Sequence, residues 1–150
     1  MNRLLAVLCI VLFVVSCGRK GPPRPPEDFA PQQVVGFDAR GDVEGVLLSW
    51  SAPTKTANGD ALVDLAEFEI RRAIEEDGEF ERPDTIATVP FIDIQKPDGS
   101  AHIFTWRDRK VTPGIRYRYD AVAVNDSGTE GTASPPLLVT FRGNSTQVQR

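Results

Sequence analysis

The stretch VTPGIRYRYDAVAVN, at residues 111–125, decides the fold of this chain. Tyr117, Tyr119, Ala121 and Ala123 lie at every second position, and mostly polar side chains stand between them. A period of two residues is typical of a strand with one buried face. The Pro-Gly pair at the start of the stretch is a turn signal. The stretch therefore predicts a turn that leads into the longest strand of the protein.

Outward from this stretch, shorter segments show the same β character. We expect further strands at residues 35–39, 46–50, 66–72, 85–89, 102–106 and 137–141. Turn signals separate them, such as Asn58-Gly59-Asp60, the charged Glu75-Glu76-Asp77-Gly78 and Pro97-Asp98-Gly99-Ser100. No window of a dozen residues keeps a helical period. About seven short strands predict an all-β fold, an antiparallel β-sandwich over residues 31–142, followed by a disordered tail at 143–150.

The residues of these segments resemble the fibronectin type III domain. Trp50 in LLSWSAP matches the buried Trp of its second strand, and Phe68-Glu69-Ile70 matches the aromatic-x-aliphatic of its third strand. Residues 111–125, with Gly128 after them, are similar to its tyrosine corner and penultimate strand. The resemblance implies that Tyr117 buries its ring and hydrogen-bonds through its hydroxyl to backbone upstream. The stretch from residue 74 to residue 100 is longer than usual in that family, so we expect insertions there.

The large aromatic side chains are best assigned to the core of this sandwich. The expected core residues are Trp50, Phe37, Phe68, Trp106, Tyr117 and Tyr119. A sugar-binding platform is the alternative for Trp106. Because Trp106 lies in phase with Phe104 on the same strand, the pattern favours the core.

The first residues have the pattern of an export signal. Arg3 is followed by the apolar run LLAVLCIVLFVV at residues 4–15, which spans about 18 Å as a helix and is short for a bilayer crossing. The last four residues, VVSC at 14–17, resemble the bacterial lipobox. That resemblance implies that residues 1–16 are removed and that Cys17 is lipidated. A simple signal peptide or a single membrane anchor with an incidental Cys is the alternative.

Residues 17–30 read as a lipidated Cys and a proline-rich tether. Four prolines between positions 22 and 26 favour an extended spacer, and a proline-rich ligand for a partner groove is the alternative. Arg19, Lys20 and Arg24 can attract anionic lipid. CGRKGP at 17–22 also resembles the start of small LptM-like proteobacterial lipoproteins, whose best-known member assists maturation of the lipopolysaccharide translocon. This chain departs from that pattern at Pro23 and Arg24.

Charge and residue types exclude several functions. Seventeen Lys and Arg against 21 Asp and Glu give a net charge of −4, which argues against a nucleic-acid-binding face. One His and two Cys are too few for a zinc site. His102 has only Ser100 beside it, and Glu75-Glu76-Asp77 lacks the spacing of a calcium loop. Arg40-Gly41-Asp42 spells the integrin-binding tripeptide, but ordinary turn chemistry is the favoured interpretation. We predict no catalytic, cofactor or metal site.

These observations predict a non-enzymatic, lipid-anchored binding or scaffolding module of the bacterial cell envelope. Its expected partners are the membrane, through Cys17, and a protein of the envelope, with no nucleic acid. Gly18 after the Cys resembles lipoproteins sorted to the outer membrane. The loops at 54–64 and 125–135 are the expected interaction surface, because they are long and polar. The alternatives are an envelope-biogenesis factor acting through CGRKGP and a glycan-binding accessory module.

Overall fold

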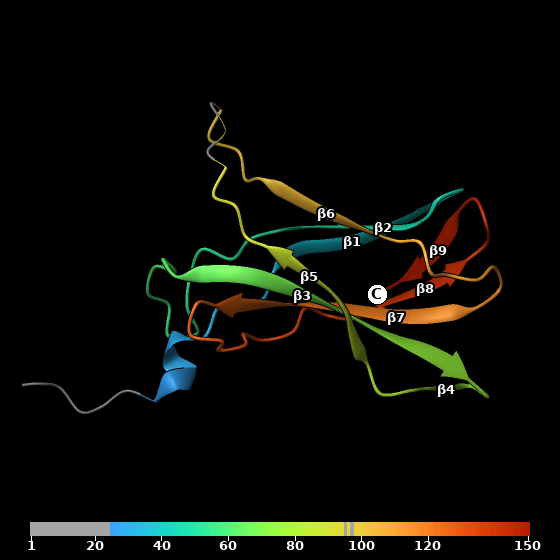
Figure 1. Ribbon diagram of the computed structural model, residues 1–150, viewed down its shortest axis with the longest axis horizontal. Helices are drawn as coiled ribbons and strands as arrows, with labels where there is room; N and C mark the ends of the chain where they lie inside the picture. Colours follow the sequence, from blue (N-terminus) through green and yellow to red (C-terminus); the bar gives the residue numbers. More distant parts are fainter. Residues whose placement is uncertain (1–24, 95, 97) are drawn as a thin grey trace, which may run out of the picture.

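Two antiparallel sheets pack face to face in this computed structural model, which describes residues 25–94, 96 and 98–150 (Figure 1). The smaller sheet has the order β1 (Val35–Asp42), β2 (Gly45–Ser51), β6 (Ile103–Asp108). The larger one runs β4 (Glu79–Phe80), β3 (Leu65–Glu76), β7 (Arg116–Asn125), β8 (Leu137–Phe141), β9 (Thr146–Gln149), and β5 (Asp84–Pro90) also pairs with β3. A 3-10 helix, η1 (Pro26–Phe29), precedes them.

The predicted signal peptide at 1–16, the lipidation site Cys17 and the tether up to residue 24 lie outside the described residues. Within the described part of the chain, no helix is long and apolar enough to cross a bilayer.

The core lies between the two sheets and is built by the alternation seen in the sequence. Every second residue of β2 from Val46 to Trp50 is buried, and so are Phe68 and Ile70 of β3. On β7 the inward residues are Tyr117, Tyr119, Ala121 and Ala123, with none more than 3% exposed. One face of each sheet is thereby removed from water, and this burial of apolar surface is the main favourable contribution to folding. The predicted antiparallel β-sandwich is confirmed.

Each of the seven expected strands has a counterpart, and the structure adds two more in the described residues. The charged segment at 75–78 was expected to be a turn, but β3 runs on through Glu76 and pairs with β4, so that only Asp77 and Gly78 turn. Both residues have positive φ, 51° and 86° respectively. The β3–β4 extension is one of the insertions expected between residues 74 and 100.

The expectation of a disordered tail at 143–150 is wrong for its second half. Residues Thr146–Gln149 form β9, which pairs with β8 along its free edge. Val148 packs against the core, and Arg150 forms an ion pair of 2.9 Å with Asp38 on β1. A polar segment is ordered here because it covers a strand edge that would otherwise leave backbone groups unpaired.

The integrin-like tripeptide at residues 40–42 belongs to β1 and is not itself the turn. The turn consists of Val43 and Glu44, and Asp42 caps it by accepting a 2.8 Å hydrogen bond from the Glu44 backbone N–H. The Asp42 carboxylate also pairs with Arg107 on β6. A Cβ on Gly41 would lie 2.7 Å from the backbone carbon of Ser145, so the docking of the β8–β9 turn requires a glycine. The expected turn is therefore adjacent to the tripeptide.

The chain enters the sandwich at one end, which we call the entrance end. Three backbone hydrogen bonds tie the entering segment to the β2–β3 loop, from Asn58 to Asp28, from Ala57 to Ala30 and from Gln32 to Lys55. The antiparallel order also brings the β5–β6 and β7–β8 loops to this end, on the left in Figure 1. The β1–β2 and β3–β4 turns lie at the opposite end, which we call the far end.

Candidate functional site

A groove lies at the entrance end of the sandwich. It has a volume of about 550 Å³ and lies between the β2–β3 and β5–β6 loops. Its walls are largely apolar and come from residues 52–54, 62, 63, 65, 91–94, 96, 99–102 and 104. Apolar walls with a few polar groups are the usual composition of a binding site.

The floor of the groove is an aromatic cluster that continues into the core. The Phe91 ring lies 5.8 Å from Phe104 and 6.2 Å from Phe68, centroid to centroid. The His102 ring stands edge-on against Phe104 at 4.6 Å. Phe104 in turn lies 6.2 Å from Trp50, the largest buried side chain. Because its floor belongs to the close-packed core, the groove has a firm base.

The rim of the groove exposes aliphatic side chains. Val63 is 90% exposed, Ile92 59% and Ile94 45%. A singly exposed aliphatic residue is normal on a protein surface, but a group of them around one groove points to contact with another apolar surface. The exposed aliphatic side chains of the rim therefore provide hydrophobic contact area.

Local hydrogen bonds shape the charged part of the β5–β6 loop. Lys96 Nζ donates a 3.0 Å bond to the Ala101 carbonyl. The Asp98 carboxylate accepts bonds from the backbone N–H and hydroxyl of Ser100, at 2.9 and 2.7 Å. These bonds, led by the one from the backbone N–H, hold the pKa of Asp98 below its usual value. Lys96 and Asp98 are thus engaged in the loop's own turn.

Only one of the two loops that were expected to form the interaction surface lines the groove. The loop at 54–64 supplies Thr54, Leu62 and Val63 to the groove. The loop at 125–135 does not line it. It contacts the end of the other loop, because the Asp126 backbone N–H donates to the Asp64 carbonyl at 2.8 Å.

The β5–β6 side of the groove was not predicted from the sequence. Phe91, Ile92 and Ile94 follow Pro90 at the end of β5, in a stretch interpreted only as an insertion. Three large apolar residues within four positions, next to a turn signal, were the available clue. Their common wall with Leu62 and Val63 depends on tertiary structure and leaves no mark in the sequence.

The predicted core residues take two kinds of position. Trp50, Phe68, Tyr117 and Tyr119 are buried, with at most 3% of their surface exposed. Trp106 is only half-buried, and it packs against the margin of the core. It does not line the groove. The glycan-platform interpretation of Trp106 gains no support from this position.

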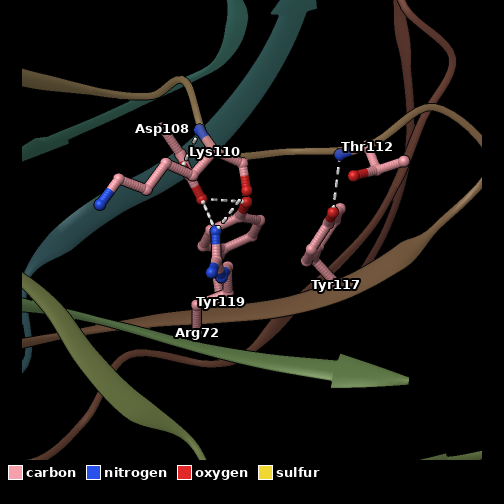
Figure 2. A network of polar contacts seen from close by, with 6 residues as sticks. All are labelled: Arg72, Asp108, Lys110, Thr112, Tyr117 and Tyr119. Atoms are coloured by element: carbon pink, nitrogen blue, oxygen red, sulfur yellow. Dashed lines mark hydrogen bonds and ion pairs between the residues drawn. The ribbon is translucent and has the colours of Figure 1, made fainter. Parts of the chain in front are cut away.

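Tyr117 forms the corner that the family resemblance implied. Its hydroxyl accepts a 2.8 Å hydrogen bond from the Thr112 backbone N–H, on the loop that precedes β7 (Figure 2). The Tyr117 ring is 3% exposed, and the Arg72 guanidinium lies over it at 5.4 Å. The bond satisfies a backbone donor in a segment that lacks strand partners, and it fixes the path of the loop.

A second polar network lies beside this corner and joins the two sheets (Figure 2). Asp108, at the end of β6, accepts bonds of 2.7 Å from Arg72, 2.9 Å from the Tyr119 hydroxyl and 2.9 Å from the Lys110 backbone N–H. Arg72 also donates to the Lys110 carbonyl at 2.9 Å. Burial, together with the negative charge of Asp108, raises the pKa of Tyr119 far above its ordinary value.

This network is structural rather than catalytic. Both oxygens of the Asp108 carboxylate are occupied by three protein donors, and Asp108 is 2% exposed. A substrate has no access to a carboxylate in that position. His102 packs on Phe104, and the part of the chain that the structure describes contains no group of three or more His, Cys, Asp or Glu placed to hold a metal ion.

Solved fibronectin type III domains are similar to this chain. The third fibronectin III domain of human KIAA0343 protein has 14% identity and a TM-score of 0.50, over 85% of this chain and 96% of that domain. The fourth FNIII domain of another human structure has 15% identity to this chain and a TM-score of 0.51, over 85% of this chain and 88% of that domain.

The kinase region of twitchin from C. elegans has 17% identity and a TM-score of 0.47 over 76% of this chain, which spans only 17% of that longer chain. No protein-family model matches the sequence, and no curated protein matches it significantly. Together with the two-sheet architecture and the tyrosine corner, the two human domains show that this chain has the fibronectin type III fold.

Proposed function

We propose that this chain is a lipid-anchored, non-enzymatic binding module of the bacterial cell envelope, sorted to the outer membrane. The observation that carries the proposal is VVSC at residues 14–17, directly after a short apolar run and before a proline-rich stretch. Two or three acyl chains on one Cys give stable attachment to a bilayer. The fold supports the binding role by analogy, because sandwiches of this kind commonly present loops to partners.

The apolar groove at the entrance end is the binding surface in this proposal. Its floor is fixed by Phe91 and Phe104, and its rim exposes Val63, Ile92 and Ile94. The polar network around Asp108, by contrast, is used within the fold. Contact with a partner through packed aliphatic and aromatic side chains is the chemistry that this surface provides.

The anchor is tested by replacing Cys17 with Ser in the full chain and by fractionating the bacterial cells. The expected result is loss of the acylated species by mass spectrometry and loss of the protein from the membrane fraction. Ser16→Ala is the matched control, because a small residue remains before the cleavage site. Membrane attachment of the Cys17→Ser chain without any acylation would overturn the proposal.

A second candidate function rests on the residues CGRKGP at 17–22, which resemble the start of LptM-like lipoproteins. In that case the N-terminal segment is sufficient for activity in envelope biogenesis. Deletion of residues 31–142 with the anchor kept separates the two candidates. If the sandwich carries the role of the protein in the envelope, the deletion abolishes that role. If the N-terminal segment carries it, the deleted chain remains active.

A further inference from the structure

The exposed apolar residues of this domain are strongly biased to one end. The described residues contain seven large hydrophobic side chains that are exposed, and six lie at the entrance end: Phe29, Val35, Val63, Ile92, Ile94 and Ile103. Val35 and Ile103 belong there because both pair with Ser51, the last residue of β2. Val43, in the β1–β2 turn, lies alone at the far end and is 82% exposed.

The chain also enters the sandwich at this end. η1 is tied to the β2–β3 loop by the Asn58–Asp28 and Ala57–Ala30 hydrogen bonds, and the same loop carries Leu62 and Val63 to the groove. The described part of the chain therefore begins with η1 at the apolar end of the domain (Figure 1), and the segment back to Cys17 precedes it in the sequence.

The length of that segment limits how far the domain can stand from a bilayer. The eight peptide units between Cys17 and Pro25 span at most about 28 Å when fully extended. The domain is longer than this, since the 12 residues of β3 alone extend about 40 Å. An acyl group on Cys17 thus holds the entrance end close to the lipid, and a short tether makes even a weak contact well populated.

We propose that the apolar entrance end docks on the lipid bilayer beside its own anchor, with Val63, Ile92 and Ile94 in the interfacial layer. This inference rests on the proposed lipid anchor at Cys17, and it identifies the bilayer as the partner that the apolar groove of the proposed function contacts. The transfer of exposed aliphatic side chains from water to the boundary between headgroups and acyl chains is favourable, because it lowers the free energy of the system. The domain then stands upright on the membrane, and its far end points away from it.

The charges of the entrance end select the kind of lipid. The loops of this end carry the acids Asp28, Asp60 and Asp98, and they carry only two cations, Lys55 and Lys96. An excess of carboxylates is repelled by anionic headgroups and tolerated by zwitterionic ones. The loops of the entrance end therefore favour phosphatidylethanolamine and phosphatidylcholine. Because Arg19, Lys20 and Arg24 of the tether attract anionic lipid, zwitterionic vesicles isolate the contribution of the exposed aliphatic side chains.

The test uses the acylated full-length protein in phosphatidylethanolamine–phosphatidylcholine vesicles, with an environment-sensitive fluorophore on an introduced Cys. Acylation blocks Cys17, and Cys9 leaves with the signal peptide, so the introduced thiol is the one that is labelled. Val63→Cys carries the probe at the entrance end. Val43→Cys is the matched control, because it is the same residue type, similarly exposed, at the far end.

The expected result is a blue shift and a rise in emission at residue 63 when vesicles are added, with neither change at residue 43. Ile92→Asp with Ile94→Asp abolishes the shift at residue 63 while the protein stays anchored. Equal responses at 63 and 43, or a water-like signal at both, overturn the inference. A shift at residue 63 without vesicles also overturns it, because a second copy or a protein segment then covers the end.

Acyl mass and vesicle flotation, measured on the same samples, separate this inference from the proposed function. An unacylated chain that does not float contradicts the anchor itself. An acylated chain that floats, with residue 63 in water, contradicts the docking alone.

Discussion

Arg72 on β3 and Asp108 at the end of β6 form an ion pair between the two sheets, with 2.7 Å between Nη1 and Oδ2. The side chains are 16% and 3% exposed, so that both charges have lost most of their water. Tyr119 and the Lys110 backbone supply the remaining hydrogen bonds of the carboxylate. The two residues are 36 positions apart in the sequence. Their ion pair connects the two sheets at the end of the core where the tyrosine corner lies.

Removing one partner of this pair should be strongly destabilising. Asp108→Ala leaves the Arg72 guanidinium buried without a counter-charge, and the expected loss in the free energy of unfolding is about 3–5 kcal/mol. Urea unfolding followed by tryptophan fluorescence measures it. Arg109→Ala is the control, because its contact with Glu44 is 3.8 Å long and the two side chains are 73% and 59% exposed. That change should cost less than about 0.5 kcal/mol, and equal losses for the two variants would contradict the role of the buried pair.

The two tyrosines of β7 should respond differently to loss of the hydroxyl. Tyr117→Phe removes a neutral bond to the Thr112 N–H, so we expect a loss of about 1 kcal/mol. Tyr119→Phe removes a bond to the charged Asp108, and about 1.5–3 kcal/mol is expected. The free energies of unfolding of both variants provide the comparison. A larger loss for Tyr117→Phe than for Tyr119→Phe would count against this order.

Gly41→Ala should weaken the docking of the β8–β9 turn. The new Cβ would meet the Ser145 carbonyl at 2.7–2.8 Å and the Thr146 side chain, and such overpacking costs about 1–3 kcal/mol. Thermal unfolding measures the loss, and faster carboxypeptidase digestion would show that β9 has come loose. Deleting residues 145–150 removes the clashing atoms, so Gly41→Ala should cost almost nothing in that background. A full cost in the truncated chain would refute the steric explanation.

The buried carboxylate Asp120 should make stability fall as the pH rises. Burial raises its pKa above the ordinary value, although the charges of Arg71 and Arg118 oppose this, and its Oδ1 has no hydrogen-bond partner. The folded state therefore binds this proton more tightly than the unfolded chain does. That stabilisation is present below the unfolded pKa and is lost as the pH rises through the folded pKa.

Asp120→Asn isolates this effect. Its stability relative to the native chain should increase between about pH 3.5 and pH 7, as measured by urea unfolding at each pH. Asp98→Asn is the control with the opposite sign, because the Ser100 bonds lower the pKa of Asp98, and its relative stability should fall over the same range. A difference between native and Asp120→Asn chains that does not vary with pH would exclude the mechanism.

The fold was largely predictable because its elements repeat a local pattern. The alternation in β2, β3 and β7 showed which faces are buried, and the family resemblance of residues 111–125 placed the tyrosine corner. Strand β9 was not predictable from TQVQ, a polar tetrapeptide that becomes a strand only because the edge of β8 is available to it. The β3–β4 extension was hidden in the same way by its run of charges.

The candidate site was predicted only in part. The β2–β3 loop was chosen correctly for its polarity and its turn residues, yet its contribution to the groove comes from Leu62 and Val63. The opposite wall, with Phe91 and Ile92, belongs to a segment distant in the chain. The pairing of two loops depends on strand order, which neither loop encodes.

By itself, the sequence determined the alternating strands, the Pro113-Gly114 turn and the motif at Cys17 on which the proposed anchor depends, and its family resemblance implied the corner at Tyr117. These features are local, because side-chain period, turn chemistry and a contiguous motif need no distant partner. The tertiary structure alone decided the Arg72–Asp108 pair, the docking of β9 and the gathering of exposed aliphatic residues at the entrance end. Each of these depends on bringing remote segments together, and only the packing of the two sheets fixes which segments meet.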